Sequence, residues 1–184
     1  MKRYDAIKKI IKTIEDEIVV CNIGAPSREL FSLKDRDKNF YMLGSMGLAS
    51  SIAFGIAISK PTHKVWCIDG DGSILMNLGS LSTIANNHPE NFTLIVIDNG
   101  SYGSTGDQRT YTSKKTKLET IARGSGFESI NVIIDERDII STLKGLGIGC
   151  HFVKIEVSPG NARVNNINLN PEEIKQRFMK AILE

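Results

Sequence analysis

The chain has 184 residues, of which 41% are hydrophobic and 24% are charged, as in an ordinary globular domain. These proportions argue against a disordered or collagen-like chain, and 23 Lys and Arg against 21 Asp and Glu are too balanced to argue for nucleic-acid binding, although small local basic patches are compatible with these numbers. No apolar run approaches the roughly 18 residues needed to span a bilayer, and the first residues lack the apolar core of a signal peptide. The scattered Cys21, Cys67 and Cys150 suit a reducing compartment. We therefore expect a cytoplasmic protein with no membrane or nucleic-acid partner.

Helical and extended patterns alternate along the chain. In chain order we expect a helix at 3–16, a strand at 18–21, a helix at 27–33, a strand at 40–43, a helix at 46–59, a strand at 65–68, a helix at 77–87, a strand at 92–97, a helix at 118–124, a strand at 130–134, a helix at 136–145, a strand at 152–157 and a helix at 171–183. The nearly continuous apolar run at 92–97 is typical of a parallel strand buried on both faces. We predict one domain over 1–184, a three-layer α/β/α structure with a mostly parallel sheet of about six strands and right-handed crossovers.

Two segments stand out from this pattern. Residues 46–59 are apolar almost all round, which predicts a helix buried against the sheet, against a partner chain, or both. Residues 98–117 are polar and rich in Gly, Ser and Thr, and a loop of that length inside a compact domain is usually functional or mobile.

Two of the predicted strands end in turns that can present oxygen ligands, Gly70-Asp71-Gly72-Ser73 and Asp98-Asn99-Gly100. Ligands of open parallel sheets bind beyond the carboxyl ends of the strands. The Asp71 carboxylate, the Asn99 amide oxygen and a backbone carbonyl just past Asn99, that of Ser101, are the kind of oxygen ligands that magnesium takes. The amides of Gly72 and Ser73 are placed to bind phosphate oxygens. Each turn alone is a common turn former, but the ordered pair is more specific.

The combination of Gly70-Asp71-Gly72 with Asn99 resembles the motif of the thiamine-diphosphate enzymes. In that family an Asp side chain, an Asn side chain and a nearby backbone carbonyl hold the magnesium ion that anchors the cofactor diphosphate. The resemblance implies that Asp71 and Asn99 ligate Mg²⁺ through their side chains and Ser101 through its main-chain oxygen. It also implies that the residues around them contact the cofactor, namely Gly70, Gly72, Ser73 and Tyr102. The family motif usually has two asparagines, and here Asp98 replaces the first.

A second match lies upstream, at Gly44-Ser45-Met46-Gly47. This run resembles the family's segment beneath the thiazolium ring, where a bulky apolar residue keeps the cofactor bent. The resemblance makes Met46 that residue and the carbonyl of Gly44 the acceptor for the cofactor's amino group. Gly44 and Met46 are thus the catalytic candidates, and Ser45 joins them in the cofactor-binding set. Without the resemblance, Met46 is a core methionine.

The resemblance covers residues 18–157, and the run at 98–108 is most similar to the subgroup of sulfopyruvate decarboxylases, with phosphonopyruvate decarboxylases next. It implies decarboxylation of a 2-oxo acid, most specifically 3-sulfopyruvate to sulfoacetaldehyde and CO₂ in coenzyme M biosynthesis. The chain has no room for the family's second module, which binds the pyrimidine and carries an activating glutamate. Glu29, in a helix with a surface-like pattern, does not match that glutamate. A separate α subunit is therefore implied, with the active site between the two chains of a hetero-oligomer.

Other functions remain open at this point. They are a phosphonopyruvate decarboxylase subunit, the β subunit of a 2-oxoacid:ferredoxin oxidoreductase, and a non-catalytic nucleotide-binding α/β module. The scattered cysteines count against the oxidoreductase, and the absence of a P-loop or dinucleotide motif counts against the nucleotide-binding module. The candidates for binding the substrate sulfonate are Ser104, Thr105, Gln108, Arg109 and His88.

Overall fold

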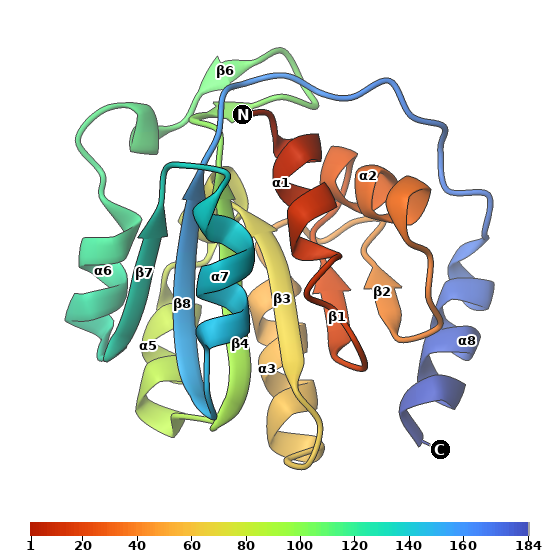
Figure 1. The fold of residues 1–184 in the computed structure, drawn as a ribbon. Helices are drawn as coiled ribbons and strands as arrows, with labels where there is room; N and C mark the ends of the chain where they lie inside the picture. The colour runs from red at the N-terminus through yellow and green to blue at the C-terminus, as the bar shows by residue number, and fades with distance from the viewer. Residues whose placement is uncertain (184) are drawn as a thin grey trace.

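The computed structural model describes residues 1–183 and has the predicted three-layer α/β/α architecture (Figure 1). Its central sheet has six strands in the order β2-β1-β3-β4-β8-β7, and every neighbouring pair is parallel. The strands are β1 (Ile18–Cys21), β2 (Asn39–Tyr41), β3 (Val65–Gly70), β4 (Asn91–Asp98), β7 (Ser129–Ile133) and β8 (Gly149–Glu156).

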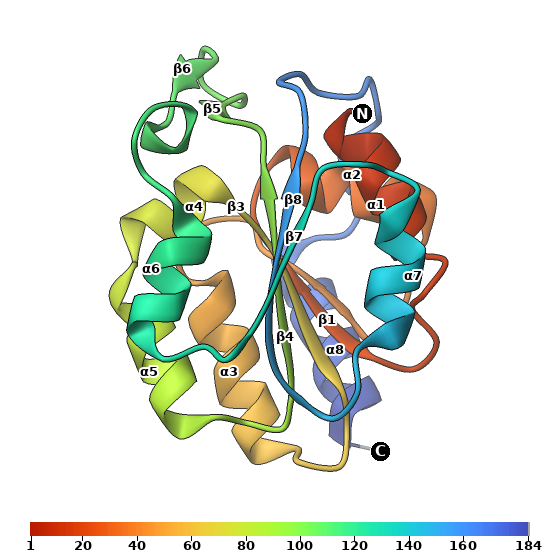
Figure 2. The same cartoon turned by 60° about the vertical axis from the view of Figure 1, so that its left-hand side comes forward.

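Helices cover both faces of the sheet (Figure 2). One face carries α1 (Arg3–Ile10), α2 (Ala25–Leu33) and α7 (Asp138–Gly145). The other carries α3 (Ala49–Ser59), α4 (Asp71–Met76), α5 (Gly79–Asn87) and α6 (Leu118–Ser125). The last helix, α8 (Pro171–Leu183), packs beside β2, where the ring of Phe178 lies 5.2 Å from that of Phe40. No helix within residues 1–183 is long and apolar enough to cross a bilayer.

Alternation along the central strands divides the core into two clusters. In β3, Val65 and Cys67 face the α3 side, whereas Trp66 and Ile68 face the α1 side. Most positions of a strand buried on both faces are apolar, and Asp71 and Asn99 come directly after β3 and β4 end. Since β1, β3 and β4 are neighbours, the loops that follow them share one edge of the sheet. The small hairpin of β5 (Ser101–Tyr102) and β6 (Gln108–Arg109) lies above that edge (Figure 1).

Three predicted boundaries need correction. The helix expected at 3–16 ends at Ile10, and residues 11–13 form a turn in which Thr13 donates to the Ile10 carbonyl. The helix expected at 46–59 begins only at Ala49, because Ser45 (φ 57°) and Gly47 (φ 92°) have left-handed backbones that no helix accommodates. The expected loop at 98–117 contains the hairpin and a 3₁₀ turn, η1 (Tyr111–Ser113). The other expected elements agree with the structure to within three residues at each end.

One prediction about burial also needs correction, and another is met only in part by this chain. Leu48, just before helix α3, is 44% exposed. Helix α3 buries Ala53 and Ala57, but its Ile58 is 55% exposed. Its apolar surface therefore exceeds what this chain covers. Glu29 does not lie on the surface of α2, because it is fully buried and forms an ion pair with Arg3 at 2.9 Å.

Candidate functional site

Asp71 and Asn99 meet at the carboxyl edge of the sheet. Asp71 is the first residue of α4, directly after β3, and Asn99 directly follows β4, whose Ile97 is paired in register with Gly70. The N–H of Asn99 donates to Oδ1 of Asp71 at 3.3 Å, and the exposures of the two residues are only 7% and 1%. The two residues that the sequence singled out thus lie against one another.

The other carboxylate oxygen of Asp71 is held by two threonines. Thr110 donates to Oδ2 at 2.5 Å, and the Thr112 hydroxyl lies 2.9 Å from the same atom and 2.8 Å from Oδ1 of Asp98. Burial raises the pKa of Asp71, the hydrogen bond from Thr110 opposes that shift, and the charge of Asp98 adds to it. Neither threonine was anticipated from the sequence, although both are hydroxyl residues in the long polar loop.

The donor chemistry at this edge fits a magnesium ion. Asp71 brings a carboxylate and Asn99 a side-chain amide oxygen, and Mg²⁺ prefers oxygen ligands of both kinds. Oδ1 of Asn99 accepts from the N–H of Ser101 at 3.1 Å, and this bond brings the predicted third ligand residue beside the other two. The Ser101 hydroxyl donates to Asp107 at 2.7 Å, and its backbone belongs to the β5–β6 hairpin.

A close approach at Gly72 explains the second glycine of the motif. The ring of Tyr102 lies directly against Gly72, so that a Cβ there would overlap ring carbons. Glycine is the residue that permits such contact with a neighbouring group. Tyr102, a predicted cofactor contact, therefore packs over the turn that carries Asp71.

One cavity of about 160 Å³ joins most of the predicted site residues. Its lining includes eight of the ten predicted cofactor-binding residues, Met46, Gly70, Asp71, Gly72, Ser73, Asn99, Ser101 and Tyr102. The other two, Gly44 and Ser45, are exposed and lie outside the lining. The cavity has room for part of a cofactor, and the structure brings these residues together from three separate parts of the chain.

Met46 lies at this cavity on a loop that is held in place by hydrogen bonds of the following residue, Gly47. The N–H of Gly47 donates to the Ser73 hydroxyl at 3.0 Å, and the Gly47 carbonyl accepts from the Asn77 amide at 3.0 Å. Met46 is half-buried between the left-handed Ser45 and Gly47. The position of Met46 therefore depends on Ser73 and Asn77, and the sequence indicated nothing about Asn77.

A third strand end also contributes, and the sequence reading assigned it no role. Asn22, Ile23, Gly24 and Pro26, in the turn between β1 and α2, line the same cavity. Gly24 has a φ of 80°, which requires a residue that tolerates the left-handed region. This turn reaches the cavity because β1 lies beside β3 in the sheet. The sequence does not give the strand order, so it could not have identified the turn as part of the site.

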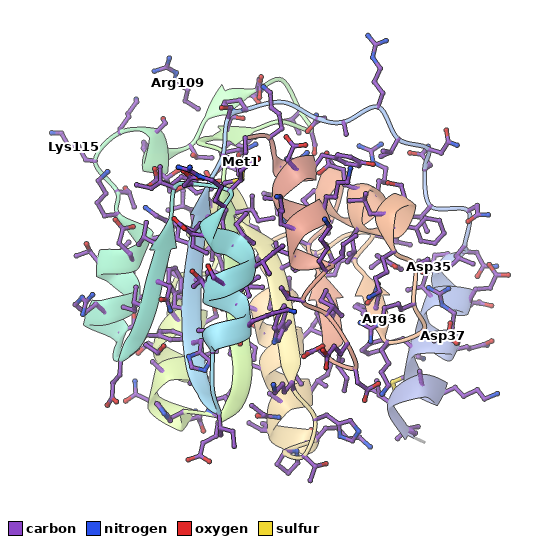
Figure 3. All side chains as sticks on the ribbon, viewed as in Figure 1. Met1, Asp35, Arg36, Asp37, Arg109 and Lys115 are labelled. Atoms are coloured by element: carbon purple, nitrogen blue, oxygen red, sulfur yellow. The ribbon has the colours of Figure 1, made fainter. Side chains whose placement is uncertain are left out.

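The structure places only some of the residues predicted to bind the substrate sulfonate at the cavity. Ser104 and Thr105 line the cavity, and the Thr105 hydroxyl also donates to the Gln108 side chain at 2.9 Å. Arg109 lies on the exposed hairpin and points away from the molecule (Figure 3). His88 follows α5 just before β4 begins, and so it lies at the opposite, amino edge of the sheet.

A second buried carboxyl lies two residues before Asp71 and is not part of the cavity lining. Asp69, in β3, is 1% exposed, and its Oδ1 accepts from the N–H of Gly70 at 2.8 Å. Burial raises the pKa of Asp69 to about 6, although the Ser73 hydroxyl and the Gly70 N–H act in the opposite direction. Its charge faces the protein interior and not the cavity lining.

The comparison with protein families agrees with this geometry. Residues 23–165 match the model described as thiamine pyrophosphate enzyme, C-terminal TPP binding domain. The chain belongs to the thiamine pyrophosphate enzymes. The match confirms the predicted family and fold, and the domain that it names binds the cofactor expected from the sequence. It does not test the individual site residues, which stay predictions.

Several thiamine pyrophosphate enzymes are similar to this chain over its whole length. The sulfopyruvate decarboxylase subunits beta of Methanococcus maripaludis and Methanocaldococcus jannaschii are each 50% identical, over 99% and 98% of this chain and 98% and 97% of their own lengths. A phosphonopyruvate decarboxylase of Streptomyces hygroscopicus is 37% identical over 90% of this chain and 42% of its own length. The subgroup resemblance seen in the sequence is thereby confirmed.

Proposed function

We propose that this chain is the β subunit of a thiamine-diphosphate-dependent 2-oxo acid decarboxylase that converts 3-sulfopyruvate to sulfoacetaldehyde and CO₂, a step of coenzyme M biosynthesis. The observation that carries the proposal is the meeting of Asp71 and Asn99 in one cavity with Met46. The high identity to sulfopyruvate decarboxylase subunits beta supports the choice of substrate. Phosphonopyruvate is the second candidate substrate, because phosphonopyruvate decarboxylases are also relatives of this chain. It ranks second because these relatives are less similar to the chain, at 37% and 35% identity.

In this proposal the chain positions a cofactor that it does not hold alone. Asp71, Asn99 and the main-chain oxygen of Ser101 hold Mg²⁺ and through it the diphosphate. When bound, thiamine diphosphate supplies an electron sink for the pair released as CO₂ leaves. Met46 supports the cofactor from one side, on a loop fixed through Gly47.

A separate α subunit completes the site. No glutamate is among the described residues that line the cavity, and Glu29, which is fully buried, is paired with Arg3 outside that lining. The apolar side of α3 that this chain leaves partly exposed offers surface for that subunit. We propose that the activating glutamate and the pyrimidine pocket come from the α chain, and that the two chains form a hetero-oligomer.

An oxidoreductase function fits the cysteines poorly. Cys21 lies on the α1 side of the sheet, whereas Cys67 and Cys150 lie on the α3 side. All three are buried, so these side chains do not converge as the ligands of an iron–sulfur cluster do.

The test uses the co-expressed α and β chains. We expect the complex to release CO₂ from sulfopyruvate only with thiamine diphosphate and a divalent cation, and more slowly from phosphonopyruvate. Asp71→Ala should abolish magnesium-dependent cofactor binding in calorimetry, whereas Asp138→Ala, a matched change at an exposed position on α7, should leave it intact. Tight binding retained by Asp71→Ala would remove Asp71 from the site.

A further inference from the structure

The cavity contains one cationic side chain that the sequence analysis did not consider. Arg3, the first residue of α1, lines the cavity together with Met46 and Asp71, and it is only 6% exposed. Of the described residues that line the cavity, Arg3 alone carries a positive charge. We infer that Arg3 is an oxyanion-binding residue of this site, an inference that rests on the proposed function.

The hydrogen bonds of the guanidinium leave one edge free. Nε donates to Oε2 of Glu29 at 2.9 Å, and Nη2 donates to Oε1 of Glu29 at 3.0 Å and to Oδ1 of Asn161 at 2.6 Å. These three bonds use three of the five N–H groups of an arginine. Nη1 forms no hydrogen bond with any residue between 1 and 183. Because Nη1 is not one of the fully buried, unpartnered side-chain atoms of residues 1–183, this donor pair remains accessible to water or to a ligand.

Glu29 holds the guanidinium without competing for the cavity. Its side chain is fully buried and absent from the cavity lining, and Oε1 also accepts from the N–H of Ala162 at 3.0 Å. The carboxylate therefore faces away from the space into which a ligand would enter. Asn161 fixes the other side, because its amide donates to the Gly103 carbonyl at 2.7 Å beside the cavity.

This arrangement suits a tetrahedral oxyanion. A guanidinium held rigidly on two sides offers its remaining N–H groups at a fixed angle, which favours phosphate or sulfonate oxygens over an uncharged group. Ser104 and Thr105 add hydroxyls to the same lining. Two ligands of the proposed function carry such an oxyanion, the diphosphate of the cofactor and the sulfonate of the substrate.

The test must keep the buried carboxylate compensated. Removing Arg3 alone would leave Glu29 charged and buried, and such a chain often fails to fold. The informative variant is therefore Arg3→Gln combined with Glu29→Gln, which replaces the ion pair with two amides. Arg3→Lys is the matched control, since it keeps a cation beside Glu29, and thermal melting of the α/β complex establishes that each variant is folded.

Calorimetry on the folded complexes then uses two probes, Mg²⁺ with thiamine diphosphate, and sulfoacetate, an unreactive small sulfonate. We expect the double variant to lose tenfold or more in affinity for one probe, and the probe affected identifies the oxyanion that Arg3 binds. The Arg3→Lys control should lose clearly less. A folded double variant that binds both probes within twofold of the wild type overturns the inference. If the wild type shows Arg3-dependent binding but decarboxylates neither 2-oxo acid, the proposed reaction fails while the inference about Arg3 stands.

Discussion

The hydroxyl of Thr110 donates to Oδ2 of Asp71 across 2.5 Å, although 39 residues separate the two in the chain. Thr110 is 1% exposed, and so this bond forms inside the protein, where an aligned donor strongly orients a carboxylate. The same carboxylate is our proposed magnesium ligand. Mutation of groups that orient a metal ligand from outside the coordination shell typically costs roughly 10- to 100-fold in metal affinity or activity.

We therefore expect Thr110→Val, which keeps the shape and removes the donor, to weaken Mg²⁺ binding by about tenfold. Titration of cofactor binding with Mg²⁺ in the α/β complex measures this. The matched change Thr83→Val, at an exposed position on α5, should have no effect. A Mg²⁺ affinity within twofold of the wild type in Thr110→Val would contradict a positioning role.

Met46 provides a second prediction. Because its loop is fixed through Gly47, its side chain has a defined position in the cavity, and truncation removes support from one side of the bound cofactor. We expect Met46→Ala to lower kcat by about 10- to 100-fold, as small misplacements of reacting groups do, with a much smaller change in cofactor Kd. Met76→Ala is the control, since Met76 is 61% exposed. Equal losses in the two variants would indicate a general packing effect.

The contact between Gly72 and Tyr102 predicts a coupled pair. A Cβ at position 72 would overlap the Tyr102 ring, so Gly72→Ala should destabilise the chain by about 1–3 kcal/mol, as overpacking does. Tyr102→Ala removes the ring and should relieve most of that loss in the double variant. Urea unfolding of the four proteins gives the coupling free energy. Additive effects, within about 0.5 kcal/mol, would mean that the clash is not the cause.

Asp35 predicts a dependence of stability on pH. Burial acts to raise the pKa of Asp35, but the hydrogen bonds from Arg177 (2.7 and 2.8 Å) and from the Tyr41 hydroxyl (2.8 Å) outweigh it and hold that pKa below its usual value. The unfolded chain therefore binds this proton at higher pH than the folded chain does. The stabilisation is complete above about pH 4, the usual value for Asp, and is lost as the pH falls through the folded pKa.

Asp35→Asn should accordingly lower the free energy of unfolding at pH 7 and flatten its decline between pH 4 and pH 2. Asp35 lies between α2 and α8 (Figure 3), so loosening of α8 should accompany the change. Urea unfolding at several pH values measures both slopes, with Asp138→Asn as the control at an exposed site. An unchanged acid slope in Asp35→Asn would assign the acid sensitivity to other carboxyls.

The sequence predicted the fold well because the central strands β1, β3 and β4 are largely apolar runs followed by turn residues. Asp71 and Asn99 were found for the same reason, since each directly follows such a run and strand order alone brings them together. Their meeting needed no knowledge of how any side chain points.

Side-chain contacts between segments far apart in the chain were not predictable in this way. Thr110 reaches Asp71 across 39 residues, Asn77 reaches Gly47 across 30, and Arg3 reaches Glu29 across 26, and no periodicity encodes these distances. The late start of α3 was missed because the apolar pattern carries no sign that Gly47 adopts a left-handed backbone. Glu29 was misplaced because a carboxylate in a helix is buried only when a partner is available, and its partner lies in another helix.

The lining of the cavity runs from Arg3 to Thr105 and takes in the ends of three neighbouring strands. A molecule bound there would tie together segments that become adjacent only when the central strands are all in place. Occupancy thus requires an assembled chain, and any partial opening of these segments must first release the bound molecule. Ligand-dependent protection of amide hydrogens should consequently extend across β1, β3 and β4 together, as one cooperative unit.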